Sequence, residues 1–256
     1  GAALYADRIY FGNPDREVPD HPFWGPAVDA EALSRAAQED GQSVDTLDDA
    51  AMIERLADEL AADRIVGWME GACEFGPRAL GHRSLLAAPH AREMRDRLNR
   101  DIKHREEFRP FAPVVPIEHV DRYFDLPPGG ARLARFMSAV FPVRPEWRAR
   151  LAAVTHVDGS ARVQVLERGM APRLHALVEA YGRRSGIPVL LNTSFNVAGE
   201  PIVTSALEGY LTFRRCAIDV LAAGSTLVTK HAAPAARSVK ETLAWSSESA
   251  VGSAAV

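Results

Sequence analysis

The chain is poor in cysteine, in clustered histidine and in long apolar runs. Its 256 residues include only two cysteines, Cys73 and Cys216, which give no disulfide framework and no metal-ligand spacing. None of the eight histidines forms an HxxxH or HExxH pair, so we expect no metal site built from this chain alone. Free thiols are typical of reducing compartments, which favours a cytoplasmic location. No apolar run approaches the roughly 18 residues of a membrane-spanning helix, and we therefore expect no membrane partner.

Lysine is also scarce. The chain has three lysines, Lys103, Lys230 and Lys240, against 27 arginines. Because codon bias can produce such a skew, the arginine count alone indicates little. Lys103 is more informative, since a lysine kept among so many arginines indicates a position that needs a compact ammonium group.

Positive charge is concentrated in one stretch of an otherwise mildly acidic chain, residues 74–113. The formal net charge is −4, yet residues 78–109 hold nine cations and five acids. Arg92, Arg95 and Arg100 fall where we expect a helix, and they can pair with neighbouring acids on its solvated face. The loop cations of this stretch are the ones that can converge on an anionic ligand. They are Arg78, Arg83, Lys103, Arg105 and Arg109.

Periodicity and Gly/Pro punctuation predict alternating strands and helices, which indicates an α/β or α+β fold. Strands are expected at 64–69, 84–87, 135–140, 187–191, 218–221 and 226–228, with a hairpin of 154–156 and 162–166. Helices are expected at 46–62, 90–101, 118–124, 144–151, 172–184 and 205–214. The apolar run IPVLL at 187–191 predicts a central strand. The prolines of FAPVVP at 111–116 predict an edge strand, because proline cannot donate to a ladder.

We expect three segments along the chain. Residues 1–45 read as a helix remnant at 2–6 followed by a Pro/Asp/Gly-rich connector, residues 46–230 as the folded domain, and residues 231–256 as a disordered Ala/Ser-rich tail. The first residues contain no initiator Met and no leader pattern. They indicate that the chain begins inside a longer polypeptide or is one half of a split protein.

Three loops, each of which we expect to follow a strand-like run, carry groups suited to binding phosphate. They are Gly76–Ser84, Lys103–Pro110 and Asn192–Pro201, with a weaker fourth at Asp158–Arg162. Arg, Lys, Ser and Asn side chains together with exposed amides can bind phosphate oxygens. No P-loop, GxGxxG or nucleophile elbow is present. We expect Ser84 and Ser194 to donate hydrogen bonds rather than to attack a substrate, so the residues alone predict a protein that binds a phosphorylated small molecule.

The segments EFGPRALGHRS, IKHREEFRPFAP, THVDGSARVQ and IPVLLNTSFNVAGEPIV together resemble the C-terminal domain of the O-carbamoyltransferase family of nodulation-factor and antibiotic biosynthesis. The resemblance runs from about Gly67 to Val228, with the motifs in order. It implies a twisted mixed sheet with helices, similar to threonylcarbamoyl-adenylate synthases. It also implies that this domain joins carbamoyl phosphate and ATP, supplied with Mg²⁺, into carbamoyl-adenylate with release of pyrophosphate. A separate N-terminal actin-like domain with a metal site would then pass the carbamoyl group to a hydroxyl of a small-molecule acceptor.

The resemblance also assigns site residues. The KxR pair (Lys103, Arg105) and the SxN pair (Ser194, Asn196) are similar to the nucleotide-binding signature of that fold. The phosphates would be held by Arg78, Lys103, Arg109 and Arg162, and the adenylate and carbamoyl groups by Asn192, Ser194 and Asn196. The residues expected to act in catalysis are Lys103, Arg109, Arg162 and Ser194. Arg83, Ser84 and Arg105 complete the expected ATP and carbamoyl phosphate site, and no dedicated Mg²⁺ ligand is evident.

The sequence departs from the family pattern in two places and leaves two alternatives open. His82 stands where Asn is expected, and Ala88 and His90 replace parts of an expected Asp-Pro-Arg. GAALYA resembles only the closing helix of the actin-like domain, so that domain or a separate subunit is an expected partner. The alternatives are a non-catalytic ATP-binding half that docks a partner, and an RNA-binding protein. The net charge and the few aromatic residues near the basic loops argue against nucleic acid.

Overall fold

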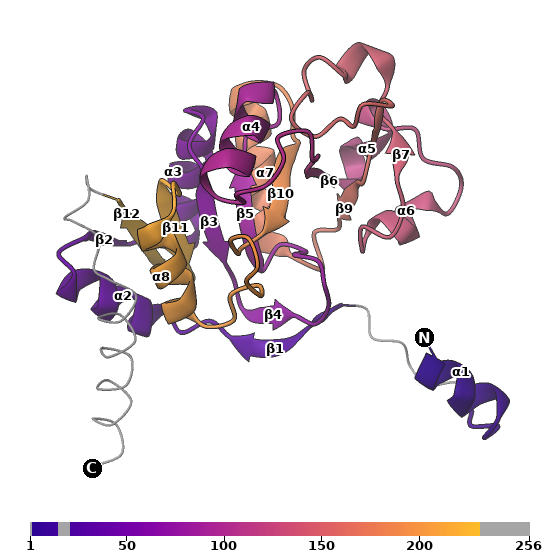
Figure 1. Ribbon diagram of the computed structural model, residues 1–256, viewed down its shortest axis with the longest axis horizontal. Helices are drawn as coiled ribbons and strands as arrows, with labels where there is room; N and C mark the ends of the chain where they lie inside the picture. Colours follow the sequence, from indigo (N-terminus) through magenta and orange to yellow (C-terminus); the bar gives the residue numbers. More distant parts are fainter. Residues whose placement is uncertain (1, 15–20, 231–256) are drawn as a thin grey trace.

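An eight-stranded mixed sheet forms the centre of the computed structural model, which describes residues 2–14 and 21–230 (Figure 1). The strand order is β2-β12-β11-β3-β5-β10-β6-β9. The pairs β11–β3 and β6–β9 are parallel and the others antiparallel. In that order the strands are Ser43–Thr46, Thr226–Thr229, Val220–Ala223, Val66–Met69, Arg83–Ala87, Leu190–Ser194, Ala112–Pro116 and Gln164–Leu166. The expected α/β class with a mixed sheet is confirmed.

Helices cover both faces of this sheet. Helices α2 (Ala30–Glu39), α4 (Arg92–Asp101) and α8 (Ala206–Arg215) contribute to one buried core. Helices α3 (Asp49–Ala61) and α7 (Pro172–Ser185) contribute to a second core on the other face. Because the central strands are buried on both sides, β3 and β6 are almost wholly apolar, whereas β5 and β10 each have polar residues at the end that carries Ser84 and Ser194.

Smaller elements surround the sheet. Two ribbons pair β1 (Phe23–Ala27) with β4 (Ala72–Glu74) and β7 (Phe141–Pro142) with β8 (Ser160–Ala161). The remaining helical turns are η1 (Ile117–His119), α5 (Val120–Tyr123), α6 (Gly130–Ala134) and η2 (Pro145–Trp147). Helix α1 (Ala2–Ile9) lies away from the sheet (Figure 1). No helix within 2–14 and 21–230 is long and apolar enough to cross a membrane.

The region expected to be a connector before residue 46 contains regular structure instead. Strand β1, helix α2 and strand β2 form there, and β2 pairs with β12 at the edge of the main sheet. Asp29 caps α2 by accepting a hydrogen bond from the Ala32 amide, and Leu33 and Ala37 of this helix are fully buried. The cap and the apolar positions are helix signals that the neighbouring prolines and aspartates obscured.

Three strand predictions also differ from the structure. FAPVVP is an interior strand, because β6 pairs with β10 on one side and β9 on the other. Residues 154–166 form no hairpin, since β8 pairs with β7 and β9 pairs with β6. Residues 135–140 follow α6 as a turn, with Met137 at a φ of 52°. Apolar content alone does not show whether such a short run is an interior strand, an edge strand or a turn, because its pairing partner is distant in sequence. The expected disordered tail lies outside the described residues.

Candidate functional site

The loop after the central strand β10 meets the segment after α4, and this contact assembles the lysine and the SxN pair. Lys103 Nζ lies 2.6 Å from the Ser194 carbonyl oxygen, 3.0 Å from the Asn196 carbonyl oxygen and 2.7 Å from Asn196 Oδ1. Ser194 Oγ donates to Asn196 Oδ1 at 2.7 Å, and Asn196 Nδ2 donates to the Glu200 carbonyl at 2.8 Å. The two motifs are 91 positions apart along the chain, and the sheet brings them into direct contact.

Lys103 is a buried cation, only 5% exposed. Burial, reinforced by the positive charge of Arg105, lowers the pKa of Lys103 to about 7. The three nearest oxygen atoms around Nζ match the three donors of an ammonium group and support its charged form, with Ser194 Oγ more distant at 3.4 Å. Lys103 therefore fixes the loop from Ser194 to Asn196 and places a charge behind it.

Four arginines extend the positive region around Lys103. Burial lowers the pKa of Arg105, and the charges of Arg109 and Arg162 lower it further, against an opposing effect of Glu106. Burial likewise lowers the pKa of Arg162, and the charge of Arg78 adds to this. Arg105 Nε donates to Asn99 at 2.7 Å, and Arg109 pairs with Glu106 at 2.8 Å. We call Arg78, Lys103, Arg105, Arg109 and Arg162 the cation cluster.

The cation cluster is only partly neutralised by protein groups. The side chain of Arg162 is half-buried, and its Nε has no hydrogen-bond partner within the described residues. Its guanidinium experiences the like charge of Arg78. A buried donor without an acceptor beside a like charge is unfavourable, and an anion would supply an acceptor.

Buried polar groups line strands β5 and β10 beside the cation cluster. Ser84 lies opposite Ser194 in the register of the two strands, and Asn192 lies two positions before Ser194, so the three share one face of the sheet. Ser84 Oγ and Asn192 Oδ1 are buried without a hydrogen-bond partner in 2–14 and 21–230. These two atoms form a polar floor that can accept a ligand group or water.

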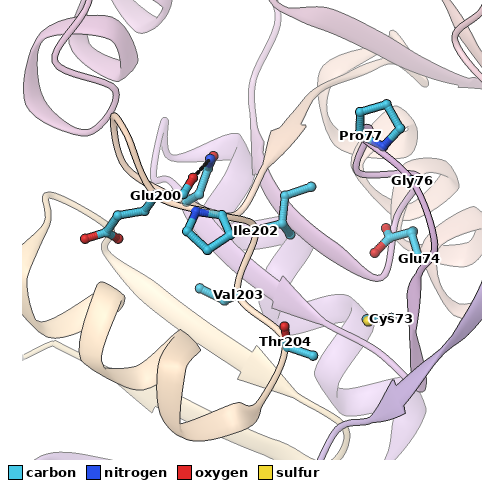
Figure 2. Close-up of a pocket in the computed structure, with 10 residues that line it drawn as sticks. Cys73, Glu74, Gly76, Pro77, Glu200, Ile202, Val203 and Thr204 are labelled. Carbon is cyan, nitrogen blue, oxygen red and sulfur yellow. Dashed lines mark hydrogen bonds between the residues drawn. The ribbon is translucent and has the colours of Figure 1, made fainter.

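A cavity of about 400 Å³ opens next to Asn196. Figure 2 shows the loop after β10 facing the loop after β4 across it. One wall is formed by Cys73, Glu74, Gly76 and Pro77, and the other by Asn196, Glu200, Pro201, Ile202, Val203 and Thr204. The volume lies in the usual range for small-molecule sites. The cavity and the cation cluster meet at Asn196 and at the loop that carries Arg78.

Two residues that the sequence did not single out organise the site. Glu74 Oε1 accepts hydrogen bonds from the amides of Leu80, His82 and Arg83, at 2.7 to 3.2 Å, and so folds the Gly76–Ser84 loop. Gln164 accepts from Asn192 Nδ2 at 2.6 Å and donates to the Leu80 carbonyl at 2.8 Å. Glu74 stands directly before the glycine-rich loop, which is a usable signal. The role of Gln164 depends on tertiary contacts, so no local feature of the sequence indicates it.

Arg83 has a different role from the one predicted. Its side chain is fully buried, and its guanidinium donates to the backbone carbonyls of Pro26, Glu70, Gly71, His82 and Thr204 at 2.8 to 3.3 Å. Every nitrogen of the fork is engaged, so no donor is free for a phosphate. We revise Arg83 from a phosphate ligand to a support that ties the β1 ribbon and the loop before α8 to the sheet.

We expect Arg83→Met to lower the free energy of unfolding by about 3–5 kcal/mol, because it leaves several buried carbonyls without a donor. Urea unfolding followed by circular dichroism measures this. The control is Arg100→Met, since the Arg100 side chain is 63% exposed and pairs only with its neighbour Asp101. That variant should change stability by less than about 0.5 kcal/mol. Equal effects of the two substitutions would contradict the support role.

The geometry suits binding and alignment of anions more than covalent catalysis. Ser194 Oγ donates to Asn196 Oδ1, and within 2–14 and 21–230 no hydrogen bond joins Ser194 Oγ to a histidine or carboxylate that could act as a general base. A group of cations can instead lower the repulsion between two anionic reactants and hold them in line.

Comparison with known proteins found a matching family and several similar sequences. Residues 57–230 match the family described as carbamoyltransferase C-terminus. The nodulation protein NolNO of Sinorhizobium fredii is 39% identical over 239 residues, which cover 91% of this chain and 34% of that protein. The 3'-hydroxymethylcephem-O-carbamoyltransferase of Amycolatopsis lactamdurans is 39% identical over 173 residues, covering 68% of this chain and 32% of that enzyme. This chain thus spans about a third of the length of these relatives.

One solved structure also aligns with the chain. Full-length HypF, in a phosphate- and nucleotide-bound form, has a TM-score of 0.49 and 21% sequence identity. The alignment covers 67% of this chain and 24% of HypF.

Proposed function

This chain belongs to the carbamoyltransferase C-terminus family, and from that premise we propose that its cation cluster forms carbamoyl-adenylate from ATP and carbamoyl phosphate. The observation that carries the proposal is the convergence of Lys103, Arg105 and Arg162 beside the Ser194–Asn196 loop. Such a group of partly unpaired cations fits a polyanionic substrate. The adjoining cavity of about 400 Å³ offers room for the uncharged parts of the nucleotide.

The reaction balances as two steps. Water first breaks the bond between the carbamoyl group and phosphate, giving carbamate and inorganic phosphate. A carbamate oxygen then attacks the α-phosphorus of ATP, forming carbamoyl-adenylate and releasing pyrophosphate. The second step brings two anions together, and the cations would reduce that repulsion while aligning the reactants. In the first step the cations would stabilise the phosphate that leaves.

Individual roles follow from the contacts. Arg78, Arg109 and Arg162 would hold phosphate oxygens, since their guanidinium groups are the more accessible or less paired members of the cluster. Lys103 would shape the loop and stabilise the developing charge from behind it. The Ser194 and Asn196 side chains would orient the adenylate and carbamoyl groups, with Ser84 and Asn192 beneath them.

Mg²⁺ would reach the site already bound to the phosphates of ATP. Two carboxylates near the cluster are already engaged, because Glu106 pairs with Arg109 and Glu200 pairs with Arg215. Glu74 at the cavity is the exception, since its Oε2 has no hydrogen-bond partner in 2–14 and 21–230. The donor set of the site therefore suits a metal held mainly by the nucleotide, as is common for Mg²⁺. When bound, it would neutralise charge on the phosphates.

In the whole protein we propose that the carbamoyl group passes to a hydroxyl of a small molecule, with help from a further domain or subunit. Two findings support this. A relative is named as an O-carbamoyltransferase of a hydroxymethyl group, and the chain spans only about a third of its relatives. The acceptor would then be recognised mainly outside this chain.

Release of pyrophosphate and phosphate by the purified chain tests the proposal. ATP, Mg²⁺ and carbamoyl phosphate are supplied together, and each is omitted in turn. We expect pyrophosphate only when all three are present, with one phosphate for each pyrophosphate. Pyrophosphate release that does not depend on carbamoyl phosphate would contradict the proposed reaction. ATP binding without any turnover would favour the non-catalytic alternative, in which this chain only holds the nucleotide.

Anion binding should be linked to proton uptake at Lys103. Its pKa is about 7 in the empty site, and a nearby phosphate would raise this value by stabilising the ammonium. At pH 8.5 most Lys103 is neutral before binding and charged afterwards, so we expect uptake approaching one proton per ATP. At pH 6 Lys103 is already protonated and contributes none. Calorimetry in buffers of different ionisation enthalpy measures the uptake, and its persistence in Lys103→Met would assign it elsewhere.

A further inference from the structure

A second group of ionisable side chains lies where η1 meets α7, away from the loops that build the cation cluster. His175 Nε2 lies 3.2 Å from Glu118 Oε2, and His119 Nε2 lies 2.9 Å from Glu179 Oε1. One ligand atom from each of Glu118, His175 and Glu179 lies within 4.8 Å of the other two. Two imidazoles and two carboxylates thus gather from two elements that are distant in sequence.

We propose that Glu118, His175 and Glu179 bind a divalent transition-metal ion of the Zn²⁺ class, with His119 as the nearest candidate for a fourth ligand. Imidazole nitrogen and carboxylate oxygen are the donor types that Zn²⁺ and its neighbours use in proteins. This differs from our expectation of no metal site, which rested on the absence of paired-histidine motifs.

The spacing of the donors fits such an ion. Metal–ligand distances of about 2.0–2.2 Å place two ligands of a tetrahedral ion roughly 3.3–3.6 Å apart. The 3.2 Å between His175 Nε2 and Glu118 Oε2 is close to this separation. His175 and Glu179 are four residues apart on α7, so they project from the same side of the helix. Small side-chain rotations of the partly exposed glutamates would bring the third donor into range.

The surroundings hold the central ligand in place. The His175 side chain is 3% exposed, whereas those of Glu118, His119 and Glu179 are 32–50% exposed. A buried imidazole among packed neighbours loses little further freedom when it binds an ion, and the exposed glutamates leave a path from solvent. In the metal-free protein the proton of each imidazole Nε2 can be shared with a carboxylate. The ion would replace the proton between His175 and Glu118.

A metal at this position would tie two parts of the fold together. Glu118 and His119 belong to η1, which follows β6 and leads into the region of α5 and α6. His175 and Glu179 belong to α7, which packs on the sheet. The ion would therefore fasten the start of that region to a helix of the main core, so the site would act on stability and not on the proposed carbamoyl chemistry.

Titration of the EDTA-treated full chain with Co²⁺ and Zn²⁺ tests this, without any substrate present. We expect one equivalent of Co²⁺ to give the visible absorption of a four- or five-coordinate ion, and Zn²⁺ to displace it and raise Tm. Glu118→Gln and Glu179→Gln should each weaken the affinity about tenfold or more, because each removes a charged ligand while keeping its shape. These two positions are partly exposed, so both variants should fold.

His90→Gln is the matched control. His90 pairs with Asp63 at 3.3 Å on the surface, a histidine–carboxylate contact that is not part of a three-residue group. Its substitution should leave the affinity unchanged. Binding that is not saturable at one equivalent would overturn the proposal. So would an affinity that neither glutamate substitution lowers, since the ion would then be held by scattered surface histidines.

Discussion

Lys103→Met should lower the rate of pyrophosphate formation from ATP and carbamoyl phosphate by about 100-fold or more. Methionine approximates the length of lysine but carries no charge and no donors. The variant would lose the three contacts of Nζ with Ser194 and Asn196, which lie between 2.6 and 3.0 Å. It would also remove the cation nearest to the SxN loop. Loss of one preorganised donor at a transition state costs about 100- to 1,000-fold in rate.

The matched control is Lys230→Met. Lys230 is a half-buried lysine whose Nζ donates to the backbone carbonyls of Phe213 and Cys216 at the end of α8, outside the proposed site. Its substitution also removes an internal ammonium, so it measures the general effect on the fold. We expect Lys230→Met to lower stability while the folded fraction keeps its rate. A similar loss of rate in both variants would mean that Lys103 acts only through stability.

Part of the main sheet and two of its helices could be predicted because their signals are local. The apolar run IPVLL predicts a central strand, and β10 does lie between β5 and β6, although it spans Leu190–Ser194 and so begins three residues later than predicted. Pro172 begins α7, and Gly186 ends it in the left-handed conformation with a φ of 76°. Ser205 and Glu208 form a capping box at the start of α8. Each of these signals depends on neighbouring residues only.

The errors concern residues whose roles depend on distant partners. Arg83 and Arg78 look alike in sequence, since both lie in the glycine-rich loop. Arg83 occupies the first position of β5 and turns into backbone carbonyls, whereas Arg78 is exposed on the loop. His175 and Glu118 are 57 positions apart and meet only because α7 packs beside η1. Such contacts cannot be predicted from loop composition or motif spacing, because they form only when the sheet brings distant segments together.

The structure supports the choice of Lys103 as a residue that needs an ammonium group more than it supports the expected direct contact with phosphates. Its rarity pointed to a position that needs an ammonium, and the structure gives it three oxygen partners around Nζ. We expected it to hold phosphates directly, yet in this structure its donors are directed at Ser194 and Asn196. A flexible point charge fits this crowded position better than the planar fork of arginine.

Arg162→Met should separate activity from stability. We expect the rate of pyrophosphate formation to fall about 100-fold, because the variant loses a guanidinium placed for phosphate oxygens. The free energy of unfolding should stay the same or rise. Burial and the charge of Arg78 disfavour the Arg162 cation, and its Nε has no hydrogen-bond partner in the described part of the chain. Functional groups held in such unfavourable surroundings commonly destabilise the fold that carries them.

A further substitution shows whether the planar guanidinium of Arg162 or only its charge matters, and a second one serves as its control. Arg162→Lys keeps a cation but loses bidentate geometry, so it should recover only part of the rate. Arg148→Met is the control in the same region, because Arg148 Nε donates to the Val143 carbonyl at 3.0 Å and lies against Gly159. It should lower stability and leave the rate of the folded protein near that of the unmodified chain. A loss of stability in Arg162→Met with full activity would instead make Arg162 a structural residue, and the phosphate site would then rest on the remaining four cations.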